Sequence, residues 1–136
     1  MALVELGRSQ DYRDRADAGH GLAGFAEMEE AQGPLLELVL DPGDTFVTQV
    51  TAVAVLRRRD RIGLTIVASA LAVANANHGD WIHTAIRDVF GIYFEERDSA
   101  MQLCEEILED SDDRVALGAR RLHEALTAID PVLRPA

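Results

Sequence analysis

The sequence predicts an all-α fold arranged as a short α-solenoid of about three helix pairs. Three segments repeat along the chain, at residues 35–59, 64–93 and 101–129. In each, an apolar stretch meets an acidic turn and a second apolar stretch follows. Equivalent places just after the three turns, 35 and 33 residues apart, are held by Val47, Ile82 and Val115. This period is typical of helical repeats, in which stacked pairs share a core that one pair cannot form alone.

The first 33 residues differ from the rest because they are rich in glycine and in charge. We interpret residues 1–33 as a flexible N-terminal segment with one short helix near 22–31, which caps the first repeat. The repeats then form one domain over residues 34–130. Residues 131–136 begin with Pro131, which ends the last helix, and are expected to form a loose C-terminal tail.

The first helix pair is expected to begin at Pro34, since proline suits the first position of a helix. An apolar stretch over 35–40 leads to the turn Asp41-Pro42-Gly43-Asp44, and Asp44 can cap the helix that follows. That helix, Thr45–Leu56, is rich in β-branched residues, which favour strands. An α+β fold with strands near 35–40 and 45–56 is therefore the main alternative, but the 3.6-residue period and the repeat favour helix.

The second and third pairs follow the same pattern. A stripe over 64–72 leads to a predicted turn at Asn77-His78-Gly79-Asp80, with Asp80 as the cap of a helix over 81–93. A stripe over 101–108 leads to a turn at 110–113 and a helix over 115–129.

The chain is strongly acidic, with a net charge of −11. This argues against nucleic-acid binding, which needs a basic face. All 13 basic residues are arginine, which we interpret as the coding bias of a GC-rich bacterial genome. Residues 95–113 hold nine acids against one base, Arg97. This acidic block has two interpretations: a solvated helix face, or a docking surface for a basic partner.

A single cysteine, Cys104, excludes an intramolecular disulfide. It lies on an apolar stripe beside two glutamates, so we expect a buried and unreactive thiol. The N-terminus meets charge at once and does not resemble a signal peptide. The longest apolar run, residues 62–74, is too short to span a membrane. These features predict a cytoplasmic protein with no membrane segment.

Two candidate ligand sites are weaker than their alternatives. Residues 19–24 match G-x-G-x-x-G by letter, but no strand precedes them, so a flexible loop is preferred to a nucleotide site. His78, Asp80 and His83 are the right ligand types for zinc, but their spacing is not that of H-E-x-x-H. We therefore predict no cofactor, no metal and no catalytic residue.

The segment Leu35–Arg59, with the letters LLELVLDPGDTFVTQVTAVAVLRRR, resembles a HEAT repeat. It has a short first helix, an Asp-Pro turn and a second helix of the Val…Ala-Val-Leu type. Residues 64–93 and 100–129 resemble weaker copies. In this family an arginine commonly follows the valine of the second helix, whereas here Thr48 and His83 stand at those places. The resemblance implies an α-solenoid that holds a partner, and it implies no catalytic residue.

We therefore expect a non-enzymatic protein–protein interaction or scaffold module. The second helices of such repeats usually line the concave face, so their polar residues are the candidate partner-binding positions: Gln49, His83, Arg87, Arg120, Arg121 and Glu124. One alternative is an immunity or antitoxin-like protein that neutralises a basic toxin. Another is a small metal-dependent enzyme that uses His78, Asp80 and His83. The open ends of a three-pair stack also allow a homodimer.

Overall fold

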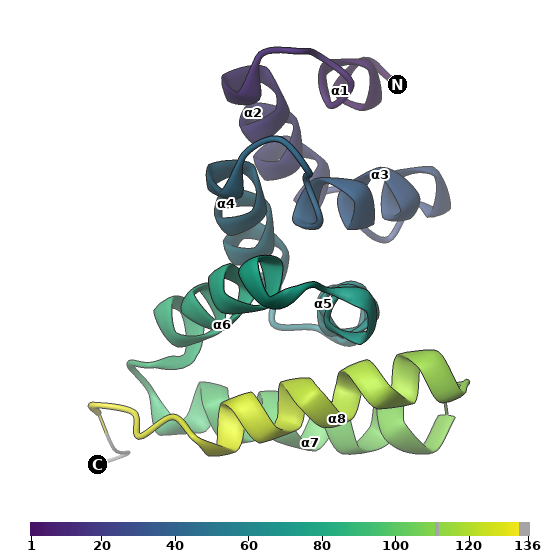
Figure 1. The fold of residues 1–136 in the computed structure, drawn as a ribbon. Coiled ribbons are helices and arrows are strands. Elements are labelled where there is room, and N and C mark those ends of the chain that lie inside the picture. Colours follow the sequence, from purple (N-terminus) through teal and green to yellow (C-terminus); the bar gives the residue numbers. More distant parts are fainter. Residues whose placement is uncertain (111, 134–136) are drawn as a thin grey trace.

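In the computed structural model, which describes residues 1–110 and 112–133, every helix and the arrangement between them can be followed (Figure 1). The described residues form eight helices and, apart from one isolated bridge, no β-structure. The helices are α1 (Ala2–Leu6), α2 (Tyr12–Ala23), α3 (Glu29–Val39), α4 (Thr45–Leu56), α5 (Arg61–Val73), α6 (Ala76–Phe90), α7 (Phe94–Asp110) and α8 (Asp113–Thr127). The predicted all-α fold is confirmed, and the α+β alternative is wrong because residues 35–40 and 45–56 lie in α3 and α4.

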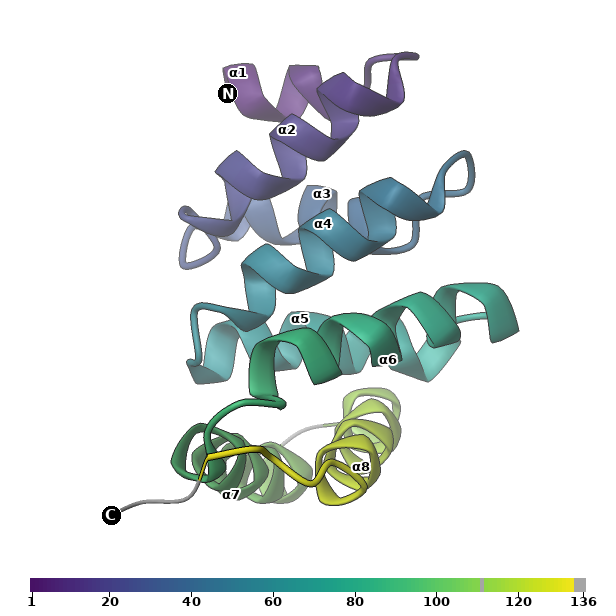
Figure 2. The same cartoon turned by 90° about the vertical axis from the view of Figure 1, so that its left-hand side faces the viewer.

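Consecutive helices form antiparallel pairs, and the pairs lie one upon another. Helices α2, α4 and α6 stack along one side, with α1, α3 and α5 behind them (Figures 1 and 2). The last pair, α7 and α8, runs across the direction of the helices above it, and α8 packs mainly against α5 and α7 (Figure 2). The described chain therefore holds four pairs, one more than the sequence predicts.

The additional pair comes from the N-terminal 33 residues, for which the prediction was wrong. Residues 22–31 do not form one helix, because α2 ends at Ala23 and α3 begins at Glu29. Helix α2 begins where the Asp11 carboxylate accepts a hydrogen bond from the Arg13 amide at 2.9 Å. Its buried face is built of small residues, and a side chain at Gly19 would overlap Thr51 of α4. Gly19, one of the glycines that suggested flexibility, instead allows α2 and α4 to pack closely.

For the first predicted pair, the position of the turn is confirmed, but the predicted start of the first helix is wrong. Helix α3 begins at Glu29, so the proposed domain border and Pro34 both fall inside it. Two carboxylates in the first turn favour this earlier start because they interact with the helix dipole. The turn at 41–44 is confirmed, and Asp44 caps α4 by accepting from the Phe46 amide at 2.8 Å.

In the second pair the predicted turn at 77–80 is wrong. These residues lie inside α6, which is capped by Asn75 through a 2.8 Å hydrogen bond from the His78 amide. Asp80 is therefore not a cap. The chain reverses in the two residues that separate α5 from α6, Ala74 and Asn75, and the asparagine side chain supplies the capping oxygen that the prediction assigned to Asp80.

In the third pair α7 begins at Phe94, well before the predicted stripe. Ser111 of the predicted turn lies outside the described residues, and Asp112 caps α8 through the Val115 amide at 2.9 Å. The expected loose tail is not loose where it is described: Leu133 donates its amide to Ile92 O at 2.7 Å. Residues 134–136 of that tail lie outside the described residues.

Arginine side chains connect helix ends that are distant in sequence. Arg58 donates to Ala23 O and Arg97 donates to Ile129 O, both at 2.7 Å, and Arg121 donates to Leu71 O at 2.8 Å. The carbonyl groups at a helix C-terminus lack intrahelical donors, and a cation there also interacts favourably with the helix dipole. These arginines therefore stabilise the ends of α2, α5 and α8.

Arg59 follows α4 with a φ of 54°, in the left-handed region. A side chain in that region costs roughly 1 kcal/mol compared with glycine. Arg59 also forms a 3.0 Å ion pair with Glu96, which both Arg59→Gly and Arg59→Ala remove. We therefore expect the glycine variant to be more stable than the alanine variant by about 1 kcal/mol in urea denaturation. Equal stability of the two variants would show that this backbone is not strained.

None of the helices in the described part of the chain combines the length and the apolar character that crossing a membrane requires.

Candidate binding groove on α2, α4 and α6

Helix α4 is unusual because its 12 residues carry no charge, although charged residues make up 27% of the chain. One side of α4 packs into the core through Val47, Thr48, Thr51, Ala52, Val55 and Leu56. The opposite side is half-exposed or exposed and is formed by Phe46, Gln49, Val50, Val53 and Ala54, which we call the α4 stripe. The stripe follows the i, i+3, i+4, i+7 spacing of one helix face. Helix α4 is thus apolar on both sides, a pattern that is typical of a covered helix.

The α4 stripe forms the floor of a groove of about 400 Å³. His20 of α2 lies at one wall and Asp88 of α6 at the other, and Arg57 lies at the C-terminal end of α4. The residues that line the groove thus come from α2, α4 and α6, the helices that stack along one side of the molecule (Figure 2).

The polar groups of the groove differ in how they are satisfied. Gln49 donates from Nε2 to the Asp88 carboxylate at 3.3 Å and so links α4 to α6. The guanidinium of Arg57 is exposed and makes no hydrogen bond or ion pair with any described residue. Its two neighbours are paired: Arg58 contacts Asp60 at 2.9 Å, and Arg59 contacts Glu96 at 3.0 Å.

An aromatic pair lies at the N-terminal end of the groove. The rings of Tyr12 and Phe46 meet edge to face, with centroids 6.1 Å apart and an interplanar angle of 85°. Arg13 lies over the Tyr12 ring, with its Cζ 5.6 Å from the centroid. Phe46 remains 48% exposed, which is high for a phenylalanine. This pair extends the apolar surface of the α4 stripe toward α2.

A buried ion pair fixes the helix starts on which the groove depends. Arg15 binds Asp41 through two hydrogen bonds, at 2.8 and 3.1 Å, and the side chain of Asp41 is only 5% exposed. The hydrogen bonds that Arg15 donates to the Asp41 carboxylate raise the pKa of the guanidinium above its usual value. The Asp41 carboxylate also accepts from the Gly43 and Asp44 amides, at 3.1 and 2.9 Å.

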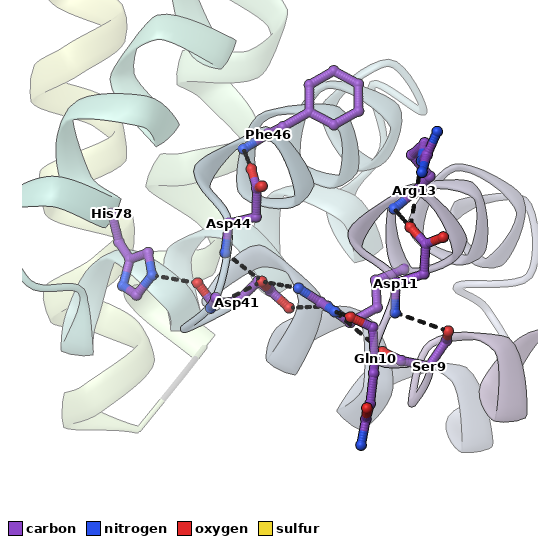
Figure 3. Close-up of polar contacts among 10 residues, drawn as sticks. Ser9, Gln10, Asp11, Arg13, Asp41, Asp44, Phe46 and His78 are labelled. Atoms are coloured by element: carbon purple, nitrogen blue, oxygen red, sulfur yellow. Dashed lines mark hydrogen bonds and ion pairs between the residues drawn. The ribbon is translucent and has the colours of Figure 1, made fainter.

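Three further hydrogen bonds connect this ion pair to the neighbouring helix pairs. The Arg15 guanidinium donates to Ser9 O and Gln10 O, and His78 Nε2 donates to Asp41 O at 2.8 Å (Figure 3). The network joins the turns before α2 and α4 to the first turn of α6. It therefore sets the positions of the three helices that line the groove.

Of the six predicted partner-binding residues, only Gln49 lines the groove. His83 and Arg87 are exposed on α6, and His83 Nδ1 is bonded to Gly79 O at 2.7 Å within its own helix. Arg120, Arg121 and Glu124 are on α8, which lies across the stack and does not continue the face of α4 and α6 (Figure 2). Arg121 has a structural contact instead, at the end of α5.

Most of the residues that line the groove were not predicted from the sequence: His20, Phe46, Val50, Val53, Ala54, Arg57 and Asp88. The sequence did hold a signal for the groove. A helix that buries only one face usually carries charged residues on the other, whereas residues 45–56 carry no charge at all. Sequence alone does not show which side of a helix that is apolar all round faces solvent.

The other candidate sites do not form ligand sites. The described residues contain no group of three or more His, Cys, Asp or Glu side chains that could hold a metal ion. His78 bonds to Asp41 and His83 bonds within α6, so their rings do not converge. Residues 19–24 are not a flexible loop as expected, because Gly19–Ala23 is the last part of α2.

Cys104 is fully buried, and this desolvation raises the pKa of its thiol from 9.0 to about 12, with a smaller effect from Glu105. We therefore expect the native thiol not to react with a disulfide reagent at mildly alkaline pH and to react fully after unfolding. Because the folded state keeps its proton longer, stability should fall as the pH rises from 9 toward 12. Fast labelling of the native protein would contradict this burial.

Comparisons with known proteins give no family for this chain. No family model matches it, and no curated protein matches it. Among solved structures, the crystal structure of an engineered protein matches at 19% identity, over 93% of this chain and 61% of that one, with a TM-score of 0.37. This chain thus spans less than two thirds of that structure. The likeness is too low to support an argument about fold or function.

Proposed function

We propose that this protein is a non-enzymatic binding module, of a HEAT-like kind, and that its groove on α2, α4 and α6 holds a segment of a partner protein. The observation that supports this most strongly is the α4 stripe, a largely apolar, half-exposed or exposed face on a charge-free helix. Surfaces of this kind mark interaction sites more often than isolated exposed apolar residues do. The resemblance of residues 35–59 to a HEAT repeat points in the same direction.

The geometry favours an amphipathic helix as the occupant. The α4 stripe runs from Phe46 to Ala54, so at about 1.5 Å per residue it is about 12 Å long, a little over two helical turns. A second helix can lay apolar residues at i, i+3, i+4 and i+7 along such a stripe. Each apolar side chain that it buries there supplies roughly 1.5–3 kcal/mol. Two or three anchors can therefore hold the partner.

The acidic character of the chain fits a partner that is basic overall. Five carboxylates of α7 are exposed: Glu95, Asp98, Glu105, Glu106 and Glu109. Surface charges of one sign attract an oppositely charged protein and raise its association rate, an effect that salt screens. This exposed acidic face also supports the second candidate, an immunity-like protein that neutralises a basic toxin through α7. Charge reversal at Glu105 and Glu109 should abolish that binding and should leave groove binding largely intact.

A comparison of variants in a native lysate tests the groove. Val53→Asp places a charge on its floor, and Val73→Asp is the matched control, because Val73 is 50% exposed at the end of α5 and does not line the groove. Both variants should keep the helical circular-dichroism spectrum. We expect a stoichiometric partner, identified by mass spectrometry, to bind the unmodified protein and the Val73 variant but not the Val53 variant.

Equal capture by both variants would exclude the groove as the binding surface. The same proteins should be measured by light scattering, which distinguishes a homodimer from a complex with another chain. If the unmodified protein is a dimer and only Val53→Asp makes it monomeric, the occupant is a second copy of this chain.

A further inference from the structure

We infer that the groove selects a partner segment that carries a carboxylate one helical turn from an apolar anchor, and that Arg57 receives this carboxylate. This inference rests on the proposed function, and it names the chemistry of the segment that the groove would hold.

The first step of the argument is the uneven use of three consecutive arginines. Arg58 and Arg59 are both engaged, the first with Glu27, Asp60 and Ala23 O and the second with Glu96. Arg57 alone among them has a free guanidinium, and it lines the groove. Arg87, Arg114 and Arg120 also make no ion pair with a described residue, but they do not line the groove, so the place of Arg57 is what distinguishes it.

The second step concerns the other charges of the groove. Asp88 is the acid among the lining residues, and its carboxylate already accepts a hydrogen bond from Gln49. No described carboxylate lies within ion-pair distance of Arg57. Arg57 is therefore the unpaired cation of the groove, and it gives the groove a place for a negative group.

The third step is the spacing along α4. Arg57 follows Val53 by four residues and Ala54 by three, so its side chain continues the α4 stripe on the same face. Along the helix axis the backbone of Arg57 lies four residues, about 6 Å, beyond that of Val53, so a carboxylate bound to Arg57 belongs at this end of the stripe. An arginine can bind a carboxylate through two parallel hydrogen bonds, which fixes orientation as well as position. The carboxylate would therefore set the register of the bound helix.

Selection from a random-peptide library displayed on phage tests this inference, with the full-length protein as bait. The baits are the unmodified protein, Arg57→Glu, Val53→Asp and the control Arg114→Glu, which reverses an exposed charge on α8 away from the groove. We expect the unmodified and control baits to enrich peptides with an acid three or four residues from an apolar residue. Arg57→Glu should enrich a basic residue at that place. A synthetic consensus peptide should bind Arg57→Gln about tenfold more weakly, the low end for a charged hydrogen bond.

The outcomes distinguish a failure of the role proposed for Arg57 from a failure of groove binding itself. If apolar peptides are enriched without an acid, or if the acid persists on Arg57→Glu, the role of Arg57 is wrong while groove binding stands. If nothing is enriched on the unmodified bait, or if Val53→Asp enriches the same peptides, the groove is not a binding surface and both proposals fail.

Discussion

Replacing Gly118 with alanine is expected to lower the free energy of unfolding by about 3 kcal/mol. Gly118 is buried on α8 where this helix crosses α5, and a methyl group there would overlap the backbone carbonyl of Ala68. A flexible side chain could move aside, but a helical carbonyl in the core cannot. The added methyl would therefore force α8 away from α5, against which most of the last pair packs.

Urea denaturation with a matched control checks this expectation. Gly79→Ala makes the same chemical change inside α6, where nothing lies within 4 Å of the added carbon. In an open helical position, alanine is more favourable than glycine by about 0.5–1 kcal/mol. The two substitutions should therefore change stability in opposite directions. An unchanged midpoint for Gly118→Ala would contradict the close contact of α5 and α8.

Replacing Arg15 with methionine is expected to cost about 3 kcal/mol or more. The substitution keeps much of the side-chain volume but leaves the buried Asp41 carboxylate without its cation, although the Gly43 and Asp44 amides still donate to it. An uncompensated buried charge is costly because the protein interior solvates it poorly. The loss should loosen the turns that position α2, α4 and α6, so groove binding should weaken as well.

Arg13→Met is the control for this prediction, because Arg13 also pairs with an aspartate, Asp11, but both side chains are exposed. Exposed ion pairs contribute at most about 1 kcal/mol, so this variant should remain close to the unmodified protein. In the double variant Arg15→Met with Asp41→Leu, the carboxylate is absent, and part of the lost stability should return. If Arg15→Met were as stable as Arg13→Met, the Arg15–Asp41 ion pair would not be what fixes the starts of these helices.

The parts of the fold that the sequence predicted depend on local chemistry. The turn at 41–44 and the cap at Asp44 follow from residue types whose preferences act within a few positions. The helical state of 45–56 was predicted correctly despite its β-branched composition, because the packing of its inner side into the core outweighs a weak local preference. The predictions for residues 22–31 and 77–80 were wrong for two different reasons. In the first, small residues were interpreted without the neighbouring helix that they allow to approach, and in the second the cap was assigned to Asp80 instead of Asn75.

The candidate site was less predictable because it depends on contacts between distant residues. Arg121 was selected as a polar residue on a second helix, yet its guanidinium binds the carbonyl of Leu71, fifty residues away. Arg57, Arg58 and Arg59 look alike in the sequence, and only the fold shows that two of them are paired. The sequence indicated the apolar outer face of α4 through the absence of charged residues from 45–56. Its exposure could be recognised only after the inner face had been assigned by packing.

Site-specific photo-crosslinking in the native host tests the central claim, that the α4 groove holds another protein, most directly. A photoreactive amino acid is placed at Val53 in one variant and at Val73 in the other, and the adducts are identified by mass spectrometry. The groove account predicts a defined protein adduct at position 53 and none at position 73. A defined adduct at position 73 together with none at position 53 would contradict it.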